Sequence, residues 1–382
     1  MQTSQSRQQE IRRERVEAVI DGRIGARQSW SRAHIAVPAS FFGIVLGLAG
    51  LGGAWRVAGR VWQLPSVIGE ALMLIAGIVW ALMLVLYAAK WIYAREEALQ
   101  ELEHPIQCCF VGLIGVATML ISIAALPYSR LAAQIAFAIG ASFMLAFAVW
   151  RTGILWRGGR DPGATTPVLY LPTVAGAFVT ATAAAALGYR DWGQLAFGAG
   201  LFSWLAIESV LLHRLYTVTE MPAPLRPTLG IQLAPPLVGG VAYLSVTTGA
   251  PDLLAYAMLG YGVLQALLLL RLLPWIRQRP FAPSYWALTF GATALAAVPL
   301  GMVERGTTGA VASIAPYVFV AANIVVALIA LATLRLMLQG QLLPKAAAPI
   351  ARDRFAKLAD GWVSRPNEPD PIAPKPTTKP SA

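Results

Sequence analysis

The stretch 71-ALMLIAGIVWALMLVLYAA-89 decides the fold class of this chain. It contains no charged residue and no proline, and its length suits an α-helix that crosses a bilayer, which takes about 20 residues. Nine further apolar runs of similar length occur, so the chain is predicted to be an all-α polytopic membrane protein with ten transmembrane helices. The predicted spans are 36–55, 66–89, 105–125, 131–150, 168–188, 193–212, 229–248, 253–274, 284–302 and 314–338.

The distribution of charge divides the chain into three parts. Only 13% of the 382 residues are charged, whereas a soluble protein carries about a quarter. The polar residues gather in a basic N-terminal segment, 1–35, and in a Pro-rich C-terminal tail, 344–382, on either side of a transmembrane domain, 36–343. We expect the tail to be disordered. The N-terminal segment has no apolar core and is therefore not predicted to be a signal peptide.

Lys and Arg indicate the orientation of the spans. Alternate loops place only five of the 30 Lys and Arg residues on one side, so 25 lie on the other side with both termini. Because the cytoplasmic side is the richer one, both termini are predicted to be cytoplasmic. This asymmetry and attraction to anionic lipid account for the net charge of +11, and no nucleic-acid partner is predicted. The five residues on the poorer side are Arg56, Arg60, Arg130, Arg190 and Arg305.

The odd-numbered spans differ from the even-numbered ones. The even spans are expected to be large, apolar and free of interior proline, which suits contact with lipid. The odd spans contain proline and clustered glycine, which bend helices and let them approach closely. We therefore expect five helical hairpins in a quasi-fivefold arrangement around a central pore, with odd helices inside and even helices outside; a tightly packed bundle is the alternative. The predicted pore-lining or helix-kink residues are Pro38, Gly43, Pro105, Gly112, Pro172, Gly176, Pro235, Gly239, Thr289 and Gly291.

The stretch 284-SYWALTFGATALA-296 places one large aromatic ring, Phe290, on a helix face of mostly small side chains. The residues three and four positions from Phe290 are Trp286, Ala287, Thr293 and Ala294, which are mostly small. The ring either fills core space between helices or projects into the expected pore, where it would exclude water and ions.

Few ionisable residues lie deep in the spans. Glu208, in the span 193–212, is expected either to pair with an arginine and hold helices together or to lie on a transport path; the peripheral position of its span favours the structural role. The adjacent Cys108 and Cys109 are expected to be small apolar helix residues rather than a disulfide. The histidines are expected to anchor or cap span ends; they are His34, His104 and His213.

No catalytic constellation occurs in the sequence. It lacks paired carboxylates, a nucleophile with a neighbouring base, a phosphate-binding loop and any metal-ligand spacing. We therefore predict no enzyme activity, no metal and no cofactor.

Seven stretches of the transmembrane domain combine small, aromatic and proline residues in specific patterns. They are 37-VPASFFGIVLGLAGLGGAWR-56, 104-HPIQCCFVGLIGVATML-120, 164-ATTPVLYLPTVAGAFVTA-181, 187-LGYRDWGQLAFGAGLFSWLAIESVLLHRL-215, 229-LGIQLAPPLVGGVAYLSV-246, 260-GYGVLQALLLLRLLPW-275 and 284-SYWALTFGATALA-296. Together they resemble the tellurite-resistance/dicarboxylate transporter family, which includes the plant slow anion channels and the fungal malate and sulfite transporters. The resemblance covers about residues 36 to 343.

The resemblance implies a fold, an assembly and a gate. The fold is five hairpins around a pore with odd helices inside, and the assembly is a homotrimer with one pore per protomer in the bacterial inner membrane. In the family a phenylalanine of the ninth span occludes the pore, in a motif similar to 286-WALTFG-291, so the role carries over to Phe290. Relatives often have a Glu-Pro pair on the sixth span where this chain has Glu208-Ser209, so this helix is expected to be straighter.

The expected function is passive conduction of small anions. A pathway without fixed charges or a carboxylate relay suits conduction, and its mouths are basic on balance. Family members differ among chloride, nitrate, malate, sulfite and tellurite-linked phenotypes. The alternative is a secondary transporter that couples dicarboxylate or oxyanion (malate, sulfite, tellurite) movement to protons, for which Glu208 would have to titrate. A third possibility is a resistance factor that acts through a soluble partner on the basic tails.

Overall fold

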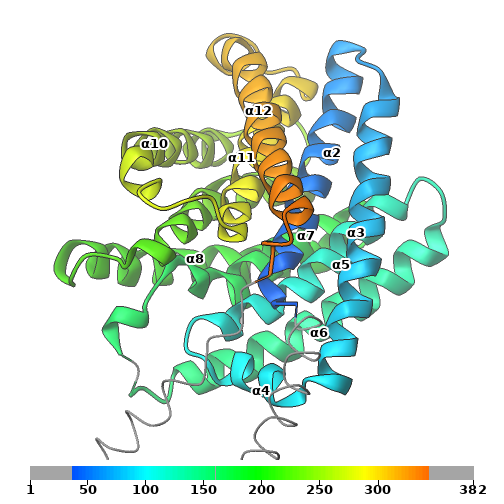
Figure 1. Ribbon diagram of the computed structural model, residues 1–382. Coiled ribbons are helices and arrows are strands. Elements are labelled where there is room, and N and C mark those ends of the chain that lie inside the picture. Colours follow the sequence, from blue (N-terminus) through cyan, green and yellow to red (C-terminus); the bar gives the residue numbers. More distant parts are fainter. Residues whose placement is uncertain (1–36, 160, 344–382) are drawn as a thin grey trace, which may run out of the picture. The chain divides into compact units, whose positions relative to one another are not determined.

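The computed structural model describes residues 37–159 and 161–343, which form helices and no strands (Figure 1). All of these residues belong to one unit, Met1–Leu343. The N-terminal segment 1–35 and the C-terminal tail 344–382 lie outside the described residues, as does His34. The predictions for both terminal segments therefore remain predictions.

Ten helical segments within the described ranges are long and apolar enough to cross a membrane, which confirms the predicted number of spans. Each lies where the sequence predicts it, and several extend beyond the predicted ends by one or two helical turns. The segments are Ala39–Trp62, Ser66–Tyr93, Gln107–Ala125, Arg130–Leu155, Pro167–Ala186, Arg190–Thr217, Ala223–Val246, Leu253–Ile276, Pro283–Glu304 and Ala310–Leu338.

Every odd-numbered span begins with a segment that is not α-helical. The segment is a 3₁₀ helix in four spans, and the fifth span contains a 3₁₀ turn followed by a π-helix. Such segments change the pairing of backbone groups and often mark functional hinges. The pairs are η1 (Ala39–Phe41) with α2 (Phe42–Trp62), η2 (Gln107–Gly112) with α5 (Leu113–Ala125), η4 (Pro167–Leu169) and η5 (Leu171–Ala175) with α7 (Gly176–Ala186), η6 (Ala223–Leu233) with α9 (Ala234–Val246), and η7 (Pro283–Leu288) with α11 (Thr289–Glu304).

The even-numbered spans are continuous α-helices. They are α3 (Ser66–Tyr93), α6 (Arg130–Leu155), α8 (Arg190–Thr217), α10 (Leu253–Ile276) and α12 (Ala310–Leu338). The expectation that they lack interior proline is wrong for α10 and α12, which contain Pro274 and Pro316. Pro274 falls in the last turn of α10 and Pro316 in the second turn of α12, so the middle of each helix is uninterrupted.

Burial alternates along the chain as the sequence predicts. The odd spans have 56% to 78% of their most apolar window buried inside the protein, and the even spans only 22% to 33%. Each odd helix packs against the even helix that follows it, as α2 and α3 do in Figure 1. The odd helices also contact one another in a closed order, in which α2 packs on α5, α5 on α7, α7 on α9, α9 on α11, and α11 on α2.

A short helix, α4 (Arg95–Glu103), links α3 to η2 and was not predicted from the sequence. Its Glu101 carboxylate accepts hydrogen bonds from Ala39 N at 2.8 Å, Lys90 Nζ at 2.7 Å and Tyr87 Oη at 3.3 Å. Lys90 and Glu101 are both buried. Because the first N–H groups of a helix lack partners within it, the bond to Ala39 fixes the start of the first span against α4.

Candidate functional site

Two cavities lie along the odd helices and share the Phe290 side chain. The small cavity has a volume of about 120 Å³ and is lined by residues from the starting ends of the odd spans. The large cavity, of about 540 Å³, is lined mainly by residues from their far ends. Of the residues that the structure describes, Phe290 and Val238 line both cavities. A path along the odd helices from one cavity to the other would therefore pass these two side chains.

The small cavity is mostly apolar. Among residues 37–159 and 161–343, its wall contains a few neutral polar side chains and no Lys, Arg, Asp or Glu. Neutral groups of this kind can contact a passing ion weakly without holding it. The polar lining residues are Ser40, Gln107, Tyr170, Thr228 and Ser284.

The backbone next to Phe290 is held tightly against α2. Thr293 Oγ1 donates a hydrogen bond to Phe290 O at 3.0 Å, and Thr289 Oγ1 donates to Trp286 O at 2.8 Å. Both threonines are completely buried. On α2, Gly50 faces Thr293 so closely that a Cβ atom there would lie 2.3 Å from Thr293 Oγ1 and 3.4 Å from Phe290 Cδ2. The small residues beside Phe290 thus allow α2 and α11 to pack closely, while the ring itself is half-buried.

Of the predicted pore-lining or kink residues, Gly43 and Pro235 line the small cavity. Gly43 lies on the α2 face that passes Trp286, whose Cβ would be 3.6 Å from an added methyl group. Pro235 is the second residue of α9, directly after the 3₁₀ segment η6. Both therefore lie near the point where an odd span changes from its first segment to α-helix.

The other four predicted glycines line neither cavity and lie between helices. An added Cβ would lie 3.1 Å from the Phe147 ring at Gly112, 2.5 Å from Met144 at Gly176, 2.6 Å from Met258 at Gly239 and 2.8 Å from Leu233 at Gly291. The structure therefore gives these glycines a packing role, since the absence of a side chain lets helices approach. Gly112 ends η2 and Gly176 begins α7, so these two also mark helix transitions.

The remaining predicted residues lie at span starts or in the α2–α11 contact. Pro38 precedes η1, and Pro105 lies in the turn before η2. Pro172 lies inside the π-helix η5. Thr289 begins α11 and packs against Gly47. None of the four lines either cavity, so a direct pore-lining role for them is not supported by the geometry.

Three of the five arginines on the side with fewer Lys and Arg residues cap the C-terminal ends of odd helices. Arg56 donates to Ile123 O at 3.2 Å and to Ala124 O at 3.1 Å, at the end of α5. Arg130 donates to Leu187 O at 3.0 Å after α7, and Arg305 donates to Leu244 O and to Thr247 O at the end of α9. The last carbonyl groups of a helix lack partners and carry negative partial charge, which favours such cations.

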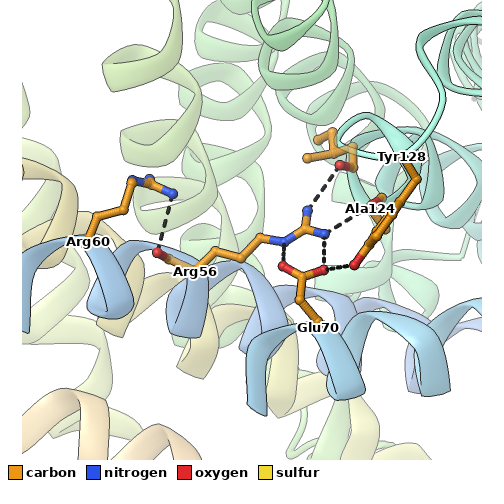
Figure 2. A network of polar contacts seen from close by, with 6 residues as sticks. Arg56, Arg60, Glu70, Ala124 and Tyr128 are labelled. Atoms are coloured by element: carbon orange, nitrogen blue, oxygen red, sulfur yellow. Dashed lines mark hydrogen bonds and ion pairs between the residues drawn. The ribbon is translucent and has the colours of Figure 1, made fainter. Parts of the chain in front are cut away.

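The guanidinium of Arg56 is held by contacts within the protein (Figure 2). Its guanidinium forms a two-point ion pair with Glu70, at 2.8 and 2.7 Å, in addition to its bonds to α5. Tyr128 Oη donates to Glu70 at 2.6 Å, and this hydrogen bond raises the pKa of the Tyr128 hydroxyl. The Arg56 side chain is only 15% exposed. The network therefore ties α2, α3 and the end of α5 together at the wall of the large cavity.

Arg60 lies one turn further along α2 and has a different environment. Its Nε and Nη2 atoms bind the two carboxylate oxygens of Glu304, the last residue of α11, with Nη2 at 3.3 Å from Oε2. The Arg60 side chain is 56% exposed and that of Glu304 is 37% exposed. Exposed pairs of this kind contribute only about 0–1 kcal/mol, so this bridge is much weaker than its geometry suggests.

Arg305 is the third arginine that lines the large cavity. Within the described part of the chain it forms no ion pair, and its partners are carbonyl and hydroxyl oxygens of Leu244 and Thr247. Partial burial lowers the pKa of its guanidinium, while the nearby Glu304 charge acts in the opposite direction. The described charged residues that line the large cavity are three arginines and one carboxylate, Glu304, so this set is positive on balance.

Glu208 is buried among neutral donors. Its carboxylate accepts hydrogen bonds from Tyr261 Oη at 2.6 Å, Gln232 Nε2 at 2.8 Å and Trp204 Nε1 at 2.9 Å, and also from Tyr170 Oη. These partners come from α8, η6, α10 and the start of the fifth span. The expected arginine partner is therefore not found: among the described residues Glu208 forms no ion pair. The site holds four spans together, and through Tyr170 it reaches the wall of the small cavity.

The predictions for His104, Cys108 and Cys109 concern the start of the third span, whereas His213 lies near the end of α8. His104 Nδ1 accepts hydrogen bonds from Ile106 N and Gln107 N, both at 3.1 Å, so it caps η2 as expected. Cys108 and Cys109 are fully buried with their sulfurs 3.8 Å apart, far beyond the disulfide bond length of about 2.05 Å. In the described ranges no three His, Cys, Asp or Glu residues are grouped so as to hold a metal ion.

Three arginines that line the large cavity, Arg56, Arg60 and Arg305, are not among the residues predicted from the sequence. Arg56 and Arg60 lie beyond the predicted first span, 36–55, whereas α2 continues to Trp62 and carries both on its last two turns. Residues four apart on a helix share a face. This spacing was the available signal, and it would have placed both side chains with Gly53 and Val57 along the same cavity wall.

The chain is similar to known anion channels and transporters. The sequence model of the voltage-dependent anion channel family (SLAC1) matches residues 36–334. A tellurite resistance protein TehA homolog from Haemophilus influenzae is 36% identical over 310 residues, which make up 80% of this chain and 92% of that protein. The S-type anion channel SLAH2 from Arabidopsis thaliana is 23% identical over 321 residues, 80% of this chain and 60% of that protein. An uncharacterized transporter from Methanocaldococcus jannaschii is 22% identical over 237 residues, 54% of this chain and 66% of that protein.

Proposed function

Because the chain belongs to the voltage-dependent anion channel family, we propose that it is a channel, or a channel-like transporter, that carries small anions through a path occluded by Phe290. The observation that carries this proposal is the position of Phe290, which lines both cavities. A ring in a narrow apolar passage blocks ions both by its volume and by excluding the water that hydrates them.

The proposed path follows the centre of the five odd helices. Their contacts run in a closed order, α2 to α5, α7, α9, α11 and back to α2, and each is covered by the even helix that follows it. These contacts support the quasi-fivefold arrangement of five hairpins. The non-α segments at the span starts support a path as well, since irregular backbone inside a membrane is tolerated where it is buried in protein or faces water.

The charges favour anions as the passengers. The described residues of the small-cavity wall are uncharged, and those of the large cavity include three arginines and one carboxylate; Glu70 pairs with Arg56, so one positive charge remains in excess. A cavity with excess positive charge concentrates anions at its mouth. We place the small cavity on the cytoplasmic side and the large cavity on the outer side, with both termini cytoplasmic, in a bacterial inner membrane. The family resemblance implies a homotrimer with one path per protomer.

The test is planar-bilayer recording of the wild-type protein and Phe290→Ala with chloride, nitrate and malate. We expect Phe290→Ala to raise anion conductance at least about tenfold, because removing a barrier of only about 1.4 kcal/mol already has this effect. Phe202→Ala is the matched control, since Phe202 is 73% exposed on α8 and lines neither cavity. Equal, near-zero currents for the wild type and Phe290→Ala would overturn the gate, and a rise in Phe202→Ala as well would show an unspecific leak.

Proton-coupled transport of a dicarboxylate or oxyanion is the second candidate. The observation that favours it is the burial of the Glu208 carboxylate without an ion-pair partner in the described part of the chain, one hydrogen bond from the wall of the small cavity. Coupled uptake would follow an imposed pH gradient and would be lost in Glu208→Gln. Uptake by Glu208→Gln that still follows the gradient would exclude Glu208 as the coupling group.

A further inference from the structure

Two arginines that line the large cavity, Arg60 and Arg305, have a charge that is available to a ligand. Their role rests on the proposed function, because they would bind anions at the entrance to the proposed path. Arg56 is excluded, because Glu70 and the α5 carbonyls occupy its donors. Arg305 is held in place by oxygens of Leu244 and Thr247 at the end of α9, which leaves its positive charge without a paired carboxylate in the described ranges. Arg60 is bound chiefly by Glu304, and both side chains are open to solvent.

We propose that Arg60 and Arg305 form a binding site for small planar oxyanions at the mouth of the large cavity, and that Glu304 is a tethered competitor for the anion at Arg60. Glu304 presents two oxygens of one planar group to Nε and Nη2 of Arg60. Nitrate and carboxylates present the same pair of oxygens, and the guanidinium fork matches them in the same two-point manner.

The pair is weak enough for exchange. An exposed ion pair gains little, since water and salt screen both charges and two long side chains must be ordered. Glu304 is also adjacent to Arg305 in sequence and acts electrostatically on it. One carboxylate therefore weakens the attraction of both arginines for an anion. When an anion takes its place on Arg60, Glu304 can turn toward solvent, to which it is already partly exposed.

The test separates a tethered competitor from a merely structural ion pair by the sign of two effects. Nitrate binding to the purified protein is measured by calorimetry, and the nitrate dependence of conductance is measured in the Phe290→Ala background. Glu304→Gln should lower the half-saturating nitrate concentration about two- to five-fold, and Arg60→Gln should raise it about two- to five-fold. The double variant should lie between the two single variants and closer to Arg60→Gln, because Glu304 occupies Arg60 directly and acts on Arg305 only through its charge.

A structural pair predicts a different pattern. Removing either partner would then shift nitrate affinity in the same direction or not at all, and this result would overturn the proposal. Arg130→Gln is the control, since Arg130 caps α7 and lines neither cavity, and nitrate affinity should be unchanged. Unfolding temperatures of all variants show whether each is folded.

The two readouts separate this inference from the function on which it rests. Nitrate binding in the expected order without current in any Phe290→Ala protein would refute the channel and leave the anion site in place. Current through Phe290→Ala with identical nitrate dependence in Glu304→Gln and Arg60→Gln would refute the site and leave the channel in place.

Discussion

Replacing Gly47 by alanine tests whether the contact of α2 with Thr289 and Trp286, next to Phe290, is too close to admit a side chain. Gly47 lies on the buried face of α2. An added Cβ atom would lie 2.3 Å from Thr289 Oγ1, 2.8 Å from Thr289 Cβ and 2.9 Å from Trp286 Cζ3. Neither neighbour can move easily. Thr289 is completely buried and bonded to Trp286 O, and Trp286 Nε1 donates to Thr333 Oγ1 at 2.9 Å.

The sign of the effect follows from two opposing terms. Alanine in place of glycine inside a helix gains up to about 1 kcal/mol from backbone propensity. Overpacking of a filled core costs about 1–3 kcal/mol, and contacts below 3.0 Å with two restrained neighbours place this site at the upper end. We therefore expect Gly47→Ala to lower the free energy of unfolding by about 1–2 kcal/mol.

The assay is thermal unfolding of the purified protein in detergent, with two controls. Gly43→Ala changes the same helix one turn earlier, where the nearest atom is Trp286 Cβ at the ordinary distance of 3.6 Å. Gly198 lies inside α8, more than two turns from its start, and an added Cβ would meet nothing within 4 Å, so Gly198→Ala should be neutral or slightly stabilising. The reasoning is refuted if Gly47→Ala unfolds at the same temperature as Gly43→Ala, because the steric conflict would then be absent.

Two further predictions concern polar groups away from Phe290. Glu208→Gln should lower the free energy of unfolding by about 1–3 kcal/mol, because an amide donor would face the hydroxyl of Tyr261 and the amide of Gln232. An unfolding temperature equal to that of the wild type would contradict the role of this hydrogen-bond network. Asp252 caps α10, and the hydrogen bond from Tyr243 lowers its pKa below the ordinary 3.8. Asp252→Ala should therefore cost about 0.5–2 kcal/mol at neutral pH, and the difference should shrink as the pH falls below about 3.8 and through the folded-state pKa; a difference constant down to pH 2 would contradict the linkage.

The sequence predicts most of the fold because the bilayer restricts what a chain can do. Long apolar runs must be helices, so the number of spans follows from composition. The odd spans are more buried because their small residues pack against other helices. Their glycine and proline content predicts this burial. What the sequence did not predict is the 3₁₀ and π character of the span starts, since backbone pairing over a few residues depends on tertiary contacts such as that of Glu101 with Ala39.

The site was less predictable than the fold. Phe290 could be singled out because a large ring among small residues is visible in a single helix. The arginines could not, because their roles depend on partners far away in sequence: Arg56 meets α5, and Arg60 meets Glu304, 244 positions away. The predicted glycines show the opposite problem. A small residue inside a membrane suits a pore wall and a helix contact equally well, and the sequence does not show that Gly176 and Gly239 lie close to Met144 and Met258.

One helix pair links the two halves of the proposed site. α11 carries Phe290 near its beginning and Glu304 at its end, and α2 contacts it along this whole length. The contact between α2 and α11 is close at Gly47 and Gly50. It is also well packed where apolar residues of both helices form a cluster with α12. Of the described ion pairs, only the exposed Arg60–Glu304 pair joins α2 to the C-terminal end of α11. Local opening costs least where buried contacts are fewest, so rearrangement of this helix pair should begin at the mouth of the large cavity rather than at Phe290.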